Sequence, residues 1–101
     1  MRYTRISTYE LTNGTFDELT GIVEKGILPT FEKEHGFVNY GMVDIGDHKV
    51  VAISIWDTRE AAEKSVLIAA SWVKENLSDR VRLVTSYVGN TALFHGLPVV
   101  A

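Results

Sequence analysis

The sequence contains no cysteine and only two prolines. A chain without cysteine has no disulfide, no thiolate metal site and no cysteine nucleophile, which fits a reducing compartment. No apolar run approaches the roughly 20 residues that a membrane span requires, and residues 1–5 lack the apolar core of a signal peptide. We therefore expect a cytoplasmic protein that has no membrane partner.

Positive charge is also scarce, because ten Lys and Arg are scattered among 13 Asp and Glu and the net charge is −3. Nucleic-acid binding requires a basic stripe, so we expect no nucleic-acid partner. The 101 residues, 46% of them apolar, suffice for one hydrophobic core. We expect one domain over residues 1–95 and a loose C-terminal tail over residues 96–101.

The apolar stretch over residues 49–56 is predicted to lie at the centre of the fold. Its side chains point alternately to two faces, and both faces are mostly apolar. Such a strand is stable only in a sheet covered on both sides, which predicts a central strand. Alternation and the content of Val, Ile, Thr and Tyr indicate further strands over residues 2–11, 37–45 and 81–88. We expect Gly89 and Asn90 to bend or interrupt the last strand.

Two helices are indicated by apolar residues that recur every three or four positions. The first is predicted to begin at Thr15, which forms a capping box with Glu18. Pro29 predicts a kink in this helix, and Gly36 suits a left-handed C-terminal cap. The second helix is predicted to start after residues 57–58 and to end at residues 78–79.

The order strand, helix, strand, strand, helix, strand is that of a ferredoxin-like βαββαβ fold of the α+β class. This fold has an antiparallel four-stranded sheet with both helices on one face. The other face also carries aliphatic side chains, and each one left in water forfeits about 1.5–3 kcal/mol. We therefore predict a homodimer whose sheets face each other in a dimeric α+β barrel, with the segment after Gly89 reaching toward the partner.

Four sequence segments carry a resemblance to a known family. They are GFV at residues 36–38, ISIWD at 53–57, REAAE at 59–63 and AASWVKENL at 69–77. In these segments the chain resembles the antibiotic biosynthesis monooxygenase-like dimeric α+β barrels. The resemblance implies oxygenation of a small aromatic or enolisable substrate, whose anion itself reduces oxygen in a pocket that stabilises it. No cofactor is therefore expected, neither metal nor flavin.

The chain departs from the catalytic pattern that the resemblance implies. Quinone-forming members carry an Asn four residues before the Trp that ends the third strand and a Tyr six residues after it. Trp56 matches that Trp, but the other two positions hold Ala52 and Ala62. At the Asn, Trp and His positions of the haem-degrading branch stand Ser7, Ser65 and Glu75, so haem binding is not favoured. The alternative function is a non-catalytic small-molecule-binding or structural dimer of the same fold.

Two residues are predicted to be catalytic. Trp56 can donate its indole N–H to a bound phenol or carbonyl, and His95 can accept a proton at a pocket lined by the dimer. Six residues are predicted to bind substrate: Ser7, Tyr9, Asn39, Tyr40, Ser54 and Trp72. Core packing is the competing interpretation for both tryptophans. No pair of histidines has metal-ligand spacing, and we expect no metal site.

The RNA-recognition motif has the same order of elements and is a further alternative for the fold. Its third strand requires aromatic side chains on which bases stack. Residues 49–55 supply one Lys and aliphatic side chains instead. The sequence therefore argues against an RNA-binding function.

Overall fold

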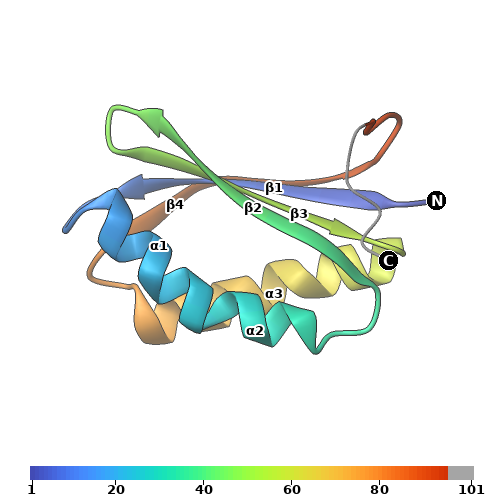
Figure 1. Cartoon of the computed structure of the whole chain (residues 1–101), viewed down its shortest axis with the longest axis horizontal. Coiled ribbons are helices and arrows are strands. Elements are labelled where there is room, and N and C mark those ends of the chain that lie inside the picture. Colours follow the sequence, from blue (N-terminus) through green and yellow to red (C-terminus); the bar gives the residue numbers. More distant parts are fainter. Residues whose placement is uncertain (96–101) are drawn as a thin grey trace.

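The computed structural model describes residues 1–95, and the predicted tail over residues 96–101 lies outside the described residues. One antiparallel sheet has the strand order β2-β3-β1-β4. Its strands are β1 (Tyr3–Leu11), β2 (Phe37–Gly46), β3 (Lys49–Trp56) and β4 (Val81–Asn90). The helices are α1 (Phe16–Lys25), α2 (Ile27–Glu32) and α3 (Arg59–Asn76). All three helices cover the same face of the sheet (Figure 1). The predicted ferredoxin-like α+β fold is confirmed.

The first predicted helix is divided into two at Gly26. The capping box is present, because Glu18 N donates to Thr15 Oγ1 at 3.1 Å and Thr15 N donates to Glu18 Oε1 at 2.8 Å. Pro29 is the third residue of α2, where its missing N–H removes no bond within that helix. Gly36 is left-handed, with φ +88°, but α2 has already ended four residues earlier, so the prediction that Gly36 caps this helix was wrong.

Helix α3 begins where the sequence predicted. The Thr58 side chain accepts a hydrogen bond from Ala61 N at 3.1 Å and caps the first turn. Ala62, Ser65 and Ala69 are buried, whereas Leu67 on the outer side is 70% exposed. Within the described residues no helix is both long and apolar enough to cross a membrane.

A two-residue turn joins β2 to β3. Asp47 and His48 have φ values of 53° and 59°, the left-handed pair that a tight hairpin of this twist requires. At the other end of the sheet, Gly89 and Asn90 remain in β4 and pair with β1. The prediction that they interrupt the strand was therefore wrong, because pairing with β1 continues to the end of β4.

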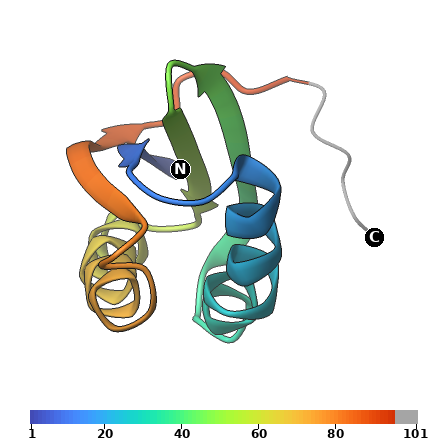
Figure 2. The same ribbon diagram turned by 90° about the vertical axis from the view of Figure 1, so that its left-hand side faces the viewer.

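The face of the sheet without helices is largely apolar. Ile6, Val43, Ile45 and Tyr87 lie on this face and are 41%, 46%, 53% and 64% exposed. We call it the free sheet face. The described residues that follow β4 turn to this side, opposite the helices (Figure 2). Their first hydrogen bond joins Thr91 N to the carbonyl of Arg2 at 2.9 Å. A single chain thus leaves an apolar sheet surface in water.

Candidate functional site

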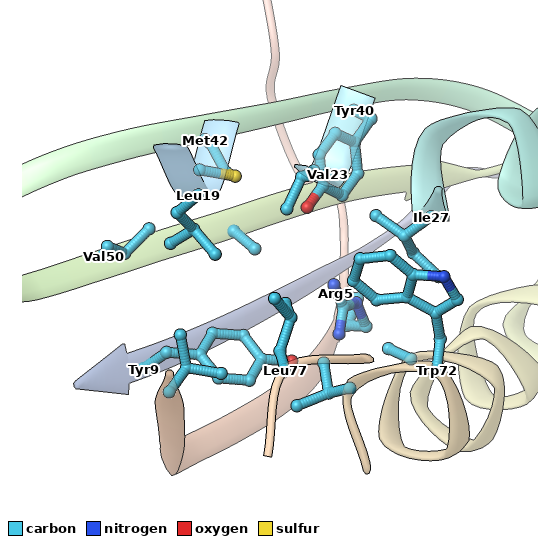
Figure 3. Close-up of a pocket in the computed structure, with 14 residues that line it drawn as sticks. Arg5, Tyr9, Leu19, Val23, Ile27, Tyr40, Met42, Val50, Trp72 and Leu77 are labelled. Carbon is cyan, nitrogen blue, oxygen red and sulfur yellow. The ribbon is translucent and has the colours of Figure 1, made fainter. Parts of the chain in front are cut away.

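A partly open cavity of about 30 Å³ lies between the sheet and the helices (Figure 3). Its lining is mostly apolar, and the residues are Arg5, Tyr9, Leu19, Val23, Ile27, Tyr40, Met42, Val50, Ala52, Ala69, Trp72, Val73, Leu77 and Val81. The volume holds a water molecule or two, well short of the roughly 300–1,000 Å³ of a ligand pocket. A ligand can therefore enter only if bordering side chains move.

The charged residue of this lining is Arg5, which is only 2% exposed. Its Nε donates to Ser54 Oγ at 3.2 Å, and its Nη1 donates to Ser7 Oγ at 3.0 Å. The guanidinium lies over the ring of Phe31, 5.6 Å from the centroid. Within residues 1–95 it forms no ion pair. Arg5 is thus a buried cation held by neutral groups alone.

Hydrogen bonds extend from Arg5 across three strands. Trp56 Nε1 donates to Ser54 Oγ at 2.9 Å, and Ser7 Oγ lies 3.0 Å from Ser86 Oγ. The sheet register explains this row, since Arg5 pairs with Ser54 on β3 and Ser7 pairs with Ser86 on β4. Ser7 and Ser54 are fully buried, so they fix the direction of the guanidinium. The row therefore orients Arg5 within the cavity.

Tyr40 provides a second polar group at the cavity. Burial raises the pKa of its phenol to about 12, although the charge of Arg5 acts in the opposite direction and Tyr9 adds to the rise. The hydroxyl is therefore protonated at neutral pH and is a hydrogen-bond donor. In Figure 3, Arg5 projects from β1 into the space that Tyr40 on β2 and Trp72 on α3 also border. Two donors of different kinds thus meet in one apolar enclosure.

A wider groove of about 290 Å³ adjoins the cavity between α3 and the strands β1 and β4. We call it the α3 groove. Arg5, Tyr9, Val73 and Val81 line both the groove and the cavity, so these four side chains form the wall between them. Its other polar lining residues include Ser7, Ser86 and Lys74. The groove is thus the more open approach to Arg5.

The structure brings together most of the residues predicted to bind substrate. Tyr9, Tyr40 and Trp72 line the cavity, Ser7 lines the α3 groove, and Ser54 holds Arg5. Asn39 is different: its neighbour Tyr40 faces the cavity, so alternation along β2 directs Asn39 to the free sheet face. Five of the six residues predicted to bind substrate thus lie around this site, and their role in binding stays a prediction.

The two residues predicted to be catalytic lie apart from the cavity. Trp56 is 1% exposed and packs edge-on against Phe31 and Phe37, with its N–H already bonded to Ser54. His95 is exposed in the segment after β4, and it lines neither the cavity nor the α3 groove. Within residues 1–95 no cluster of three or more His, Cys, Asp or Glu side chains is placed to hold a metal ion. The catalytic roles of Trp56 and His95 stay predictions.

Sequence reasoning missed Arg5 as a site residue. The signal was its position, because it alternates with Tyr3, Ser7 and Tyr9 on one face of a strand predicted to be central. A charge on the helix-covered face of a central strand is rare unless it is paired or functional. The sequence shows which face of the strand carries Arg5. It does not show whether a carboxylate lies beside the Arg5 side chain.

Fold and site together define a ferredoxin-like α+β protein with an internal cavity beneath its sheet. No protein-family model matches the sequence, and neither does any curated protein. Solved structures do match. SnoaB, a cofactor-independent oxygenase from Streptomyces nogalater, has a TM-score of 0.68 at 15% identity over 96% of this chain and 97% of that one. A protein of Chloroflexus aurantiacus J-10-fl, described as an antibiotic biosynthesis monooxygenase, has a TM-score of 0.65 at 17% identity over 95% and 98%.

The same fold occurs in proteins without an assigned task. NE2512 from Nitrosomonas europaea, a protein of unknown function, has a TM-score of 0.66 at 13% identity over 87% of this chain and 84% of that one. These comparisons confirm the predicted resemblance to the antibiotic biosynthesis monooxygenases for the fold. Because fold does not fix function, the activity has to be argued from the cavity.

Proposed function

We propose that this protein is a homodimer that binds a small aromatic or enolisable molecule in the cavity beneath its sheet and oxygenates it without a cofactor. The observation that carries the proposal is the cavity itself, where Arg5 and the Tyr40 hydroxyl converge within an apolar lining. An apolar enclosure with a few convergent polar groups is typical of small-molecule sites.

The free sheet face supports the dimer. Ile6, Val43, Ile45 and Tyr87 form an exposed apolar surface on it, and such surfaces on soluble proteins usually mark an interface. A second copy related by a two-fold axis would offer the same apolar surface in return. The segment after β4 lies on this side of the sheet, where it can reach that copy (Figure 2).

The polar groups suit the reaction. Oxygenation without a cofactor requires the substrate as its anion, which is stabilised until it passes an electron to oxygen. Because no Asp, Glu or His of the described residues lines the cavity or the α3 groove, the substrate gives its proton to solvent and binds already ionised. The Tyr40 hydroxyl stays protonated because its pKa is raised to about 12, so it can donate to an enolate or phenolate oxygen. The mostly apolar lining lowers the local dielectric constant, which strengthens that interaction. The cavity thus offers anion stabilisation in a largely apolar site.

A specific observation favours the alternative, a dimer that binds the molecule without turning it over. Ala52 lines the cavity but has no side-chain donor, and Ala62 is fully buried and does not line it. The donors that the resemblance implies at these positions are therefore missing. If Tyr40 does not replace them, binding is the whole function.

Oxygen uptake over a panel of hydroquinones and anthrones tests the proposal. We expect turnover with at least one compound and a loss of about 10- to 100-fold in kcat for Tyr40→Phe, the range for one removed donor to an oxyanion. Tyr3→Phe removes the same hydroxyl from a residue that lines neither the cavity nor the α3 groove, and it serves as the control. Binding of a compound without any uptake would establish the alternative. If no compound of the panel binds and none supports oxygen uptake, both proposed functions are contradicted.

A further inference from the structure

Among residues 1–95, no carboxylate forms an ion pair with the charge of Arg5. Taking a guanidinium out of water is costly, and buried charges are normally paired with an opposite charge. Arg5 is 2% exposed, and its recorded partners are the Ser54 and Ser7 hydroxyls and the ring of Phe31. The two hydrogen bonds use two of its five N–H donors, so donor capacity remains.

The surroundings of Arg5 are selectively free of negative charge. The chain has 13 acidic residues and a net charge of −3, yet no Asp or Glu lines the cavity or the α3 groove in the described part of the chain. The groove instead adds the exposed residue Lys74 together with Ser7 and Ser86. A cavity and groove with two cations and no acid attract an anion in an otherwise acidic protein.

We propose that Arg5 is the anion-binding residue of this site and that the ligand is an aromatic monoanion, a flat apolar body with one carboxylate or ionised phenol. The anionic group enters along the α3 groove past Lys74 and pairs with the guanidinium. The aromatic body lies against the apolar wall formed by Val73 and Val81. The inference rests on the proposed function only in taking the cavity and groove as a ligand site, not in requiring turnover.

The hydrogen bonds around Arg5 fit this role. Guanidinium recognises carboxylates through two parallel N–H bonds, which requires that its plane be fixed beforehand. Ser54 on β3 and Ser7 on β1 hold Nε and Nη1 from neighbouring strands, and Phe31 supports the ring face. Because the guanidinium is already held in place, little further conformational entropy is lost when the ligand binds. The two serines are therefore positioning residues for Arg5.

Binding of 1-naphthoate, compared with its neutral analogue 1-naphthamide by calorimetry, tests the proposal. We expect the wild-type protein to bind naphthoate about 10- to 100-fold tighter than the amide, the range for a hydrogen-bonded charge. Arg5→Met should weaken naphthoate binding about 10- to 100-fold and so abolish this preference. Arg59→Met removes an exposed guanidinium on α3 and should leave both affinities as they are. The affinity of 1-naphthol, measured at pH values below and above its own pKa, shows whether a phenolate also binds at Arg5.

The outcomes separate the two proposals. Equal affinity of wild type for naphthoate and naphthamide, no binding of either, or full naphthoate affinity in Arg5→Met would overturn the role of Arg5. Arg5→Met should fold, because an apolar side chain of similar length often replaces a buried charge at no loss. If thermal melts show that Arg5→Met is unfolded, Arg5→Lys takes its place, because lysine keeps the charge but lacks the two parallel N–H donors of the guanidinium. The wild-type preference for naphthoate over naphthamide should then be lost in Arg5→Lys. Naphthoate binding, together with no oxygen uptake across the panel of hydroquinones and anthrones, would remove the oxygenase proposal and leave Arg5 as the anion site.

Discussion

Trp72 of α3 packs its indole ring against the backbone of Gly26, at the point where α1 ends and α2 begins. A Cβ at Gly26 would overlap the six-membered ring and the indole nitrogen of Trp72. Because Trp72 also lines the cavity, the absence of a side chain at Gly26 lets the indole close the space between the two helical segments. Gly26 thus lies both at the break between α1 and α2 and against a residue that lines the cavity.

Gly26→Ala is expected to destabilise the fold by about 1–3 kcal/mol, since the added methyl forces Trp72 out of its place. Chemical denaturation followed by tryptophan fluorescence measures this change. Gly21→Ala is the matched control, because Gly21 lies inside α1 with no neighbouring atom within 4 Å of an added Cβ. It should stabilise the protein by about 0.5–1 kcal/mol. Effects of the same sign at both glycines would show that the Trp72 contact has no energetic weight.

Ile6→Lys is expected to dissociate the proposed dimer, because it places a charge at the centre of the free sheet face, where Ile6 is 41% exposed. Sedimentation equilibrium should then give a mass near 11.3 kDa, against twice that value for the unmodified chain. Leu67→Lys makes the same substitution on the outer side of α3, at a residue that is 70% exposed, and should leave the dimer intact. An unchanged mass for Ile6→Lys would place any interface elsewhere.

The raised pKa of the Tyr40 phenol predicts that the free energy of unfolding decreases at high pH. Its phenol pKa is about 12 in the folded chain and near 10 when unfolded, so the folded state holds the proton more tightly. This contribution is complete below pH 10 and is lost as the pH rises through 12, for a total of about 2–3 kcal/mol. Denaturation curves at several pH values should show the decline. In Tyr40→Phe that part of the decline should be absent, and a decline of equal size there would refute the assignment.

Much of the fold could be predicted because its signals are local. The alternation over residues 49–56 and the pairing of Thr15 with Glu18 each depend on neighbours in sequence, and each is found in the structure. Continuation of β4 through Gly89 was not predictable from local preference. Pairing with Thr4 on β1, far away in the sequence, decides it.

The site was predicted less completely because its groups meet only through sheet register. Ser54 lies 49 residues from Arg5, and Ser86 lies 79 residues from Ser7, so no sequence spacing shows that they form one row. Periodicity shows that Tyr9 and Arg5 share a face, yet it does not show that carboxylates are absent around them. Trp56 drew attention by its place in a motif, but its indole N–H is bonded to Ser54 within the core.

The location of the ligand can be measured directly by titrating 1-naphthoate into the ¹⁵N-labelled protein and following the ¹H,¹⁵N spectrum. The chain has two tryptophans, so two indole signals report from known places. A ligand in the cavity beneath the sheet should shift the Trp72 indole signal and the amides of Tyr9 and Tyr40 saturably, while Leu67 and the turn at residues 47–48 stay fixed. Saturable shifts confined to Ile6, Val43 and their neighbours on the free sheet face, or no saturable shift at Trp72, would mean that the cavity is not the binding site.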